Sequence, residues 1–261
     1  MVFTDKLTKS GILKELNISN DFTLEVFDSI DSTNLYLKEK AKNGECDYIA
    51  VSNSQTKGKG RFDRVFYSPE NCGIYMSILT KPRLKAEQSV LMTAAVSVAV
   101  CEAVFSLTKQ KPSIKWVNDL ILGNKKICGI LCEGAINPDT RCFDFAVLGI
   151  GINVYRPENN FNDEIKDIAG CVLEKKIPNF RNRITAEIIN RVFYYLENLE
   201  NKEFLEKYRE FSCVLQKEIT VMKENPIKAL ALDIDDNCRL KVKYPDGKIE
   251  YLSSGEISIK L

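Results

Sequence analysis

The segment that most constrains the fold is "SVLMTAAVSVAVCEAVFSL", residues 89–107, the longest apolar stretch in the chain. Its apolar residues recur at helical spacing, which predicts one long helix over residues 87–107. Thr93, Ser97 and Glu102 interrupt the run, and this favours a buried core helix over a membrane span. A chain of 261 residues buries roughly 70% of its unfolded surface, so it can enclose such a helix without disulfide bonds.

Charge and residue usage exclude several classes of function. Lys and Arg number 37 against 36 Asp and Glu, so the chain lacks the overall basic field of non-specific nucleic-acid binders, and we expect no DNA partner. The sequence contains no histidine, which removes Ser-His-Asp triads and every histidine-based metal site. We therefore expect neither zinc nor haem.

The cysteines indicate the compartment. All nine are scattered, none forms a C-x-x-C pair, and most have apolar neighbours. This pattern is typical of free thiols buried as small hydrophobes, which implies a reducing compartment. The N-terminal residues "MVFTDKLTKS" show no export signal. We therefore expect a cytoplasmic protein without membrane association.

Strands and helices alternate before residue 214. Capping residues and a glycine bound a predicted helix over 31–44, and Gly123-Asn124 predicts a hairpin turn, because both residues adopt positive φ readily. Between 155 and 184 the pattern loosens to a loop with a short helix. The predicted strands are 47–55, 73–81, 113–119, 125–136 and 143–154, and amphipathic helices follow at 185–200 and 202–211.

Short strands replace this alternation after about residue 215. The stretch "CRLKVKYPDGKIEYL" contains a Pro-Asp-Gly turn between two strands, and the segment as a whole predicts a small β barrel. We therefore expect a short N-terminal extension over 1–24, a large domain over 25–214 and a small C-terminal domain over 215–261.

A basic loop, "NSQTKGKGRFDR" at 53–64, follows the second predicted structural element. Gly58 and Gly60 free the backbone to wrap an anion with its amides. Four cations stand within eight residues, namely Lys57, Lys59, Arg61 and Arg64. The spacing matches neither a P-loop nor a dinucleotide fingerprint. Taken alone, such a loop is more often a solvated flexible loop than a phosphate site.

Two further stretches suggest a ligand site. In "KWVNDLILGNKKICGIL", residues 115–131, Asp119 and Lys126 flank the predicted hairpin and can hold Mg²⁺ near an acyl or phosphoryl oxygen. An exposed turn with an ordinary ion pair is the alternative. In "LGIGINV", residues 148–154, glycines within a strand indicate either the close approach of a ligand or a bulge.

Five motifs, taken together and in this order, resemble those of the biotin–protein ligases. Each motif is weak alone, but the set runs from about residue 25 to the end of the chain. The motifs are Asp31-Ser32-Thr33-Asn34; Gln55-Thr56 leading into Gly58-Lys59-Gly60-Arg61; Lys115-Trp116 with Asn118-Asp119, Lys126 and Gly129; Gly149-Ile150-Gly151-Ile152-Asn153; and Gly255-Glu256-Ile257-Ser258.

The resemblance implies an α+β fold: a mixed-sheet catalytic domain related to class II aminoacyl-tRNA synthetases and lipoate ligases, plus a small SH3-like β barrel. Members of that family use ATP and Mg²⁺ to convert biotin to biotinyl-5′-AMP. They then transfer the biotinyl group to one lysine of a biotin carboxyl carrier protein or domain of acetyl-CoA carboxylase or a related carboxylase. The family often pairs catalytic domains, which leaves a homodimer open. Only about 25 residues precede the matching region, so we expect the ligase-only form without a DNA-binding domain.

The same resemblance assigns roles to individual residues. We assign Lys126, Arg61 and Asp119 to catalysis, and Asp119 also to Mg²⁺. The residues expected to contact biotin are Ser32, Thr33, Asn34, Gln55, Gly58, Lys59, Arg61, Lys126, Gly129, Leu131, Gly149 and Gly151. The residues expected to contact ATP or the adenylate are Lys59, Gly60, Arg61, Arg64, Phe66, Lys115, Asn118, Asp119, Lys126 and Asn153.

The sequence departs from the family pattern at four positions. Lys59 replaces the family's arginine, so the positive charge is kept but the two-pronged hydrogen bonding of a guanidinium is lost. Phe66 lies where the family usually has a tryptophan, and we expect its ring to stack on adenine. Asp63 replaces a glycine, and Val117 replaces a proline. Two alternatives stay open: a lipoate or octanoate ligase of the same superfamily, and a non-catalytic ligand-binding module.

Overall fold

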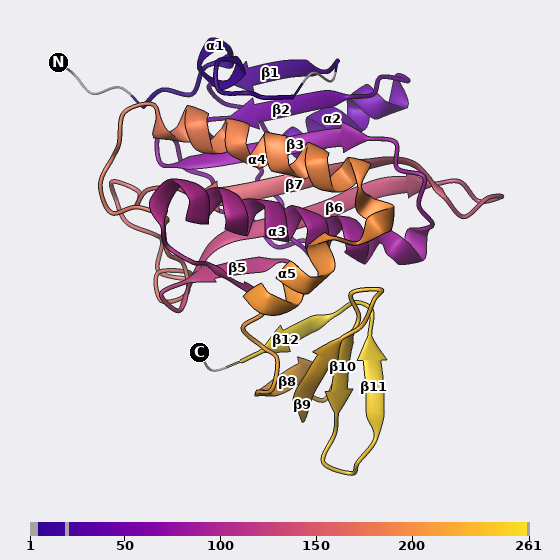
Figure 1. Ribbon diagram of the computed structural model, residues 1–261. Helices are drawn as coiled ribbons and strands as arrows, with labels where there is room; N and C mark the ends of the chain where they lie inside the picture. Colours follow the sequence, from indigo (N-terminus) through magenta and orange to yellow (C-terminus); the bar gives the residue numbers. More distant parts are fainter. Residues whose placement is uncertain (1–4, 19–20, 260–261) are drawn as a thin grey trace.

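The computed structural model describes residues 5–18 and 21–259 and places them in two β-sheets flanked by helices (Figure 1). The larger sheet has the strand order β1-β2-β3-β7-β6-β5-β4. β1 and β2 run parallel, and the other neighbours are antiparallel, so the sheet is mixed. Its strands are β1 Thr23–Phe27, β2 Tyr48–Ser52, β3 Gly73–Thr80, β4 Ser113–Lys115, β5 Asp119–Leu122, β6 Lys125–Ile136 and β7 Phe143–Asn153.

Helices cover both faces of the larger sheet. On one face α3, the predicted core helix, packs against β4 to β7, and α4 and α5 pack on α3 (Figure 1). On the opposite face α2 packs against β2, β3 and β7. The helices are α1 Lys9–Leu13, α2 Thr33–Lys42, α3 Ser89–Thr108, α4 Phe180–Glu197 and α5 Phe204–Phe211, with short 3₁₀ turns at Ala86–Gln88 and Leu199–Asn201.

α3 has the length and composition of a membrane span, and it is the one helix of the described residues that does. Together with the 3₁₀ turn before it, α3 forms a helical segment over Ala86–Thr108. Within the most apolar 18-residue stretch of this segment, 72% is buried inside the fold. The helix therefore serves as the centre of the core, as the polar interruptions in its sequence predict.

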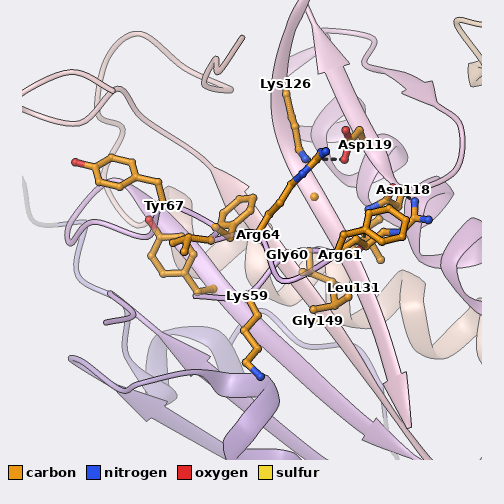
Figure 2. Close-up of a pocket in the computed structure, with 18 of the residues that line it drawn as sticks. Lys59, Gly60, Arg61, Arg64, Tyr67, Asn118, Asp119, Lys126, Leu131 and Gly149 are labelled. Carbon is orange, nitrogen blue, oxygen red and sulfur yellow. Dashed lines mark hydrogen bonds and ion pairs between the residues drawn. The ribbon is translucent and has the colours of Figure 1, made fainter. Parts of the chain in front are cut away.

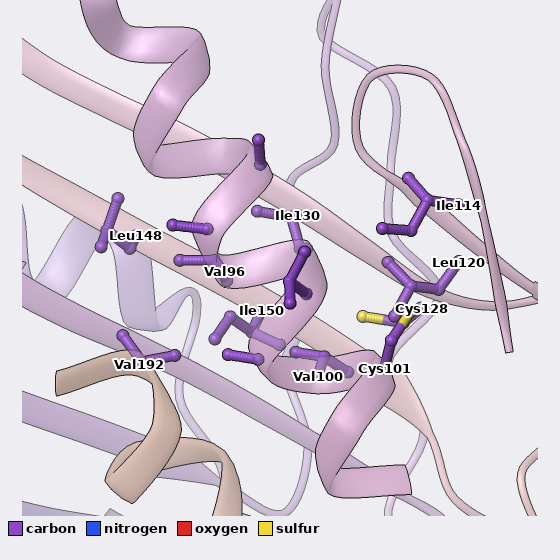
Figure 3. Packing of buried hydrophobic residues seen from close by; sticks show 14 of the residues in the cluster. Val96, Val100, Cys101, Ile114, Leu120, Cys128, Ile130, Leu148, Ile150 and Val192 are labelled. Atoms are coloured by element: carbon purple, nitrogen blue, oxygen red, sulfur yellow. The ribbon is translucent and has the colours of Figure 1, made fainter. Parts of the chain in front are cut away.

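Side chains of β6 and β7 alternate between the two faces of the sheet. Cys128, Ile130, Leu148 and Ile150 are fully or almost fully buried and pack beneath α3, as Figure 3 shows. The residues between them face α2 instead, and these include Gly129, Gly149 and Gly151. The face of the sheet toward α3 therefore forms the apolar core, whereas the face toward α2 has room for a binding site.

The structure divides the predicted strand 113–119 into β4 and β5. The chain turns at residues 116–118, so Lys115 pairs with Asp119 in an antiparallel hairpin. Trp116 is buried in this turn, and its Nε1 donates a hydrogen bond of 3.0 Å to the carbonyl oxygen of Cys238. The partner lies 122 residues further along the chain, so local sequence patterns cannot indicate the turn.

The helix predictions that follow β7 need two corrections. The structure shows turns rather than a helix between 155 and 179, and the backbone of this segment accepts a hydrogen bond from the Lys126 amide. α4 begins at Phe180, earlier than the predicted residue 185. The hydrophobic pattern did not indicate this earlier start, because the charged residue Arg181 is buried on the inner face of the helix where an apolar residue is expected.

The C-terminal part forms an antiparallel sheet with the strand order β11-β10-β9-β8-β12. Gly247 has φ of 87° in the predicted Pro-Asp-Gly turn. The strands are β8 Glu218–Met222, β9 Ile227–Ile234, β10 Leu240–Lys243, β11 Ile249–Leu252 and β12 Glu256–Ser258. The mixed-sheet α+β fold is confirmed, and the exact domain boundary near residue 214 stays a prediction.

A buried ion pair fixes the ends of β2 and β3. Arg181 Nε donates to Asp5 Oδ2 at 3.3 Å, and both side chains are at least 95% buried. The same guanidinium donates to Asn53 Oδ1 at 2.6 Å and to the carbonyl oxygen of Gly73 at 3.2 Å. Tyr155 donates its hydroxyl proton to Asp5 Oδ2 at 2.7 Å. The N-terminal segment is thereby attached to the larger sheet.

We predict that Asp5→Ala lowers the free energy of unfolding by about 3 kcal/mol, because it leaves the Arg181 guanidinium buried without its counter-charge. Urea denaturation measures this loss. Asp28→Ala serves as the control, since Asp28 is exposed and lies 3.9 Å from Lys6 in a surface pair. A loss for Asp5→Ala no larger than that for Asp28→Ala would contradict the structural role of the buried pair.

Candidate active site

A cavity of about 310 Å³ opens between the N-terminus of α2, the loop after β2 and the middle of β6 and β7 (Figure 2). Every residue to which the sequence assigned a ligand contact lines this cavity, except Gly58. Gly58 lines an adjoining groove instead, where the carbonyl oxygen of Phe66 and the Ser68 hydroxyl fill the space over its Cα. The fold thus gathers residues from widely separated segments around one space.

The floor of the cavity is built from glycines on paired strands. Gly129 of β6 lies opposite Gly151 of β7. A Cβ on Gly151 would lie 2.5 Å from the Phe66 ring, and a Cβ on Gly149 would lie 2.2 Å from Asn34 Oδ1. We expected these glycines to admit a ligand directly. In the structure, the Phe66 ring and the Asn34 amide occupy the space immediately over them.

One end of the cavity is polar and uncharged. Ser32 caps α2 by accepting a hydrogen bond from the Leu35 amide at 3.5 Å, so its hydroxyl proton stays available to a ligand. Gln55 Oε1 accepts from the Thr33 amide at 2.9 Å, and Gln55 Nε2 donates to Ser68 Oγ at 3.1 Å. This end offers both donors and acceptors to a small polar ring.

The other end of the cavity carries an excess of positive charge. Lys126 Nζ lies 2.6 Å from Asp119 Oδ1 in a partly buried pair. Arg61 donates to Asn118 Oδ1 at 3.0 Å and to the carbonyl oxygen of Gly255 at 2.8 Å. Burial lowers the pKa of Arg61, but a guanidinium stays charged in proteins. The charged lining residues are Lys59, Arg61, Arg64, Lys115 and Lys126, with Asp119 and Glu256.

The basic loop is held against the C-terminal sheet. Arg64 forms two hydrogen bonds with the Glu256 carboxylate, at 2.9 and 2.7 Å, in the bidentate geometry that suits this pair. Hydrogen bonds from Arg64 lower the pKa of Glu256. Together with the Arg61–Gly255 contact, this pair closes the loop over one side of the cavity.

Lys59 does not lie with the other cations. Figure 2 shows its side chain directed away from Lys126 and Asp119. It lines the adjoining groove, together with Glu133, as well as the cavity itself. The resemblance assigns both Lys59 and Arg61 to the nucleotide. Of the two, Arg61 bonds to the hairpin region, through Asn118.

Asn118 and Asn153, the two asparagines assigned to the nucleotide, donate hydrogen bonds to backbone carbonyl oxygens. Asn118 Nδ2 donates to the carbonyl oxygen of Ile130 at 2.8 Å, and Asn153 Nδ2 donates to that of Gly170 at 3.1 Å. Both line the cavity. The Phe66 ring stands edge-on to Tyr75, with 6.3 Å between ring centroids, so its stacking on adenine stays a prediction.

One wall of the cavity was not predicted from the sequence. Ile165, Ile168 and Ala169 line it from the turns after β7, and 60% of Ile168 is exposed. The sequence does show isoleucines recurring in this otherwise polar segment. Their position at the cavity, however, depends on a contact distant in sequence, because the Lys126 amide donates a hydrogen bond to the carbonyl oxygen of Ile168 at 2.7 Å. Gly255 and Glu256, to which the sequence assigned a family motif but no ligand contact, also line the cavity.

A metal ion would find few protein ligands here. Asp119 and Glu256 are the carboxylates that line the cavity, and each is already paired with a cation. Among the described residues, no group of three Cys, Asp or Glu side chains is placed to hold a metal. Mg²⁺ needs only one or two carboxylates when phosphates supply further oxygens, so Asp119 fits a metal that arrives with a nucleotide.

Two parts of the sequence match known families. Residues 26–153 match the biotin/lipoate A/B protein ligase family. Residues 214–260 match the C-terminal domain of biotin protein ligases. The chain belongs to the biotin/lipoate protein ligase family. The C-terminal match is to a domain named for the biotin protein ligases among them.

Individual relatives cover different shares of the chain. The bifunctional ligase/repressor BirA of Bacillus spizizenii is 34% identical over 171 residues, covering 62% of this chain and 52% of that protein. This chain thus spans about half the length of that relative. Biotin–[acetyl-CoA-carboxylase] ligase of Mycobacterium tuberculosis is 27% identical over 248 residues, covering 90% of this chain and 88% of that protein.

Solved structures support the same family. The biotin protein ligase of Aquifex aeolicus, in complex with biotin and ATP, matches with a TM-score of 0.75 and 27% identity. The match covers 90% of this chain and 97% of that chain, so it extends over both sheets. The arrangement of a mixed catalytic sheet and a C-terminal antiparallel domain is therefore shared.

The closed loop generates a prediction. Glu256→Gln removes the charge that Arg64 binds, so the loop opens more often and the amides of residues 57–66 exchange their hydrogens faster. Because the pKa of Glu256 is lowered, the contact is present above the ordinary carboxyl value of 4.5 and is lost as the pH falls below it. Hydrogen exchange followed by mass spectrometry measures both effects.

Glu218→Gln is the matched control, since Glu218 forms a 2.7 Å pair with Lys228 on the exposed surface of the same sheet. We expect no change at residues 57–66 in this variant. Equal exchange of the loop in the Glu256 and Glu218 variants would show that the Arg64 contact does not hold the loop.

Proposed function

We propose that this protein is a biotin–protein ligase that activates biotin with ATP and transfers the biotinyl group to a lysine of a carrier protein. The observation that carries the proposal is one cavity with an uncharged polar end, a glycine floor and a cationic end. Such a cavity suits a substrate with a polar ring, an apolar tail and a carboxylate that must meet a phosphate. The Aquifex neighbour, solved with biotin and ATP, supports it.

The polar end suits the ureido ring of biotin. The Ser32 hydroxyl proton can be donated to the ureido oxygen, while Thr33 and Gln55 line the same end. The glycine floor brings the apolar tail close to the sheet once Phe66 moves aside. This places the biotin carboxylate toward Lys126 and Arg61.

The cationic end suits the first reaction step. A carboxylate oxygen of biotin attacks the α-phosphorus of ATP, the bond from that phosphorus to the bridging oxygen breaks, and pyrophosphate leaves. Two anions must approach, so preorganised cations that bind the developing charge lower the barrier. Lys126 and Arg61 are the cations we assign to this role. Mg²⁺ bound by the phosphates and Asp119 would neutralise further charge.

The second step needs little acid–base chemistry. The ε-amino nitrogen of the carrier lysine attacks the acyl carbon, the bond to the phosphate oxygen breaks, and AMP leaves. The attacking amine loses a proton to solvent or to Asp119, which lies in the cavity. The closed loop keeps water from the reactive mixed anhydride in the interval.

Partners and compartment follow from the same proposal. The Mycobacterium relative is named for acetyl-CoA carboxylase, which supports a biotin carboxyl carrier domain of that enzyme as the acceptor. All nine cysteines are free, which suits a reducing cytoplasm. We keep residues 25–214 as the biotin- and ATP-binding domain and 215–261 as the C-terminal domain.

ATP–pyrophosphate exchange tests the activation step, with biotin, lipoate and octanoate supplied in parallel. We expect exchange with biotin alone. Exchange with lipoate or octanoate would assign the protein to the sister activity of its family. Absence of exchange with all three acids would leave a non-catalytic binding module as the better account.

Lys126→Ala should reduce biotin-dependent exchange by about a hundredfold or more, because it removes a cation that binds the developing charge. Lys125→Ala is the matched control: Lys125 is adjacent in sequence, and its ammonium donates to the backbone of Asp167 outside the cavity. Circular dichroism should show that both variants stay folded. Equal rates in the two variants would remove Lys126 from the mechanism.

Arg61→Gly should release biotinyl-5′-AMP while still allowing it to form. Arg61 bonds Asn118 and Gly255, so its loss weakens the closure of the loop over the intermediate. The expected result is biotinylation of unrelated proteins added to the reaction, detected by streptavidin blotting. Labelling that stays restricted to the carrier domain would contradict the closing role of Arg61.

A further inference from the structure

The helix α5 lies between the larger sheet and the C-terminal sheet, and the two neighbours of Tyr208 anchor it there (Figure 1). Lys207 Nζ donates to Glu102 Oε1 of α3 at 2.6 Å, and Arg209 Nε donates to the carbonyl oxygen of Ile234 in β9 at 2.7 Å. Consecutive residues of a helix point roughly 100° apart, so Tyr208 faces a third direction. The helix is therefore held in place independently of the bond that Tyr208 makes.

The hydroxyl group of Tyr208 is directed at the turn between β4 and β5. It donates to the carbonyl oxygen of Val117 at 2.9 Å. Tyr208 is completely buried, and burial raises its pKa well above the usual value, so the hydroxyl keeps the proton that this bond requires. Val117 is buried as well, so its carbonyl oxygen depends on a protein donor.

The next residue of this turn, Asn118, lines the cationic end of the cavity. Its carbonyl oxygen accepts from the Ile130 amide at 3.0 Å, and its Nδ2 donates to the carbonyl oxygen of Ile130 at 2.8 Å. These two bonds hold Asn118 from the side of β6, while Tyr208 holds the peptide group that precedes it. The remaining polar atom, Asn118 Oδ1, accepts from Arg61 Nη1 at 3.0 Å.

The position of Arg61 therefore depends on how this turn is held. The peptide group between Val117 and Asn118 is planar, so the direction of its carbonyl group also sets where the Cα of Asn118 lies. Without the Tyr208 donor, Asn118 is held from β6 alone. Arg61 has hydrogen bonds to Asn118 and to the carbonyl oxygen of Gly255, so a displaced Asn118 weakens one of these two attachments.

We propose that Tyr208 is a positioning residue for adenylation, because its hydroxyl group fixes the turn at Val117 and, through Asn118, the guanidinium of Arg61. This inference rests on the proposed function, in which Arg61 binds the charge that develops as biotin attacks ATP. Tyr208 does not line the cavity, so it acts through these contacts and not by touching the substrate. A misplacement of about 1 Å in an active site can cost about a hundredfold in rate.

Tyr208→Phe tests the inference, because it removes the hydroxyl group and leaves the ring that fills the core. We expect the kcat of biotin-dependent ATP–pyrophosphate exchange to fall about tenfold, since Arg61 is less often in place when charge develops. The KM for biotin should stay within about twofold of wild type, because Tyr208 acts on the cationic end of the cavity and leaves the polar end unchanged.

Tyr195→Phe is the matched control. Tyr195 is also buried, and its hydroxyl group donates to Glu102 Oε2 at 2.8 Å and accepts from Lys207 Nζ at 3.0 Å. The variant loses buried hydrogen bonds of the same kind but keeps the bond to Val117. We expect a lower melting temperature and a kcat within about twofold of wild type. Both variants are assayed well below the lower of their two melting temperatures, so that the rates refer to folded protein.

A double variant distinguishes an effect through Arg61 from a general loss. In Arg61→Gly the guanidinium that Tyr208 positions is absent, so adding Tyr208→Phe should lower the exchange rate by no more than about twofold. If Tyr208 acted on the site in another way, the two losses would multiply, and the loss of about tenfold would recur in the Arg61→Gly background.

Hydrogen exchange followed by mass spectrometry gives a readout that does not depend on catalysis. Tyr208→Phe should speed exchange at residues 116–119, because the turn has lost one of its attachments, whereas Tyr195→Phe should leave these residues unchanged.

Four results would overturn the inference: a wild-type kcat in Tyr208→Phe, an equal loss in Tyr195→Phe, a full loss repeated in the Arg61→Gly background, or unchanged hydrogen exchange at the turn. Wild-type protein that supports no pyrophosphate exchange would contradict the proposed function instead. Hydrogen exchange would then still decide whether Tyr208 holds the turn.

Discussion

The pairing of β6 with β7 is the constraint on which the rest of the site depends. Its register sets Gly129 opposite Gly151, and the alternation of the strands sends the intervening apolar side chains into the core under α3. The face toward α2 is left without side chains at those positions. The Phe66 ring and the Asn34 amide can therefore lie directly on the sheet, and a one-residue slip of either strand would fill this space.

Charge divides the same cavity into two chemically different ends. The hydroxyls and amides near the start of α2 are connected by a buried hydrogen-bond chain, and every buried side-chain polar atom in the described part of the molecule has a partner. At the other end, cations are paired with Asp119 and Glu256, so the site is assembled before phosphate arrives. The C-terminal sheet supplies Glu256 and thus takes part in closing the cavity.

The sequence predicted the elements whose patterns are local. The hairpin turn at Gly123-Asn124, the core helix and the small β domain were all evident from spacing and turn residues. The turn at Trp116 and the early start of α4 were not, because each depends on a contact distant in sequence: Cys238 for one and Asp5 for the other. The motifs predicted most of the residues that line the cavity. The cavity wall formed after β7 and the direction of the Lys59 side chain could not be predicted, because both depend on how the chain folds.

Transfer to a carrier tests the central claim most directly. The protein is mixed with ATP, Mg²⁺ and biotin in the presence of a biotin carboxyl carrier domain, with a lipoyl domain in a parallel reaction, and intact masses are recorded. The account predicts a gain of one biotinyl group on the carboxyl carrier domain alone, which disappears when its acceptor lysine is replaced. A carrier domain of unchanged mass, or a lipoyl domain modified when lipoate replaces biotin, would contradict it.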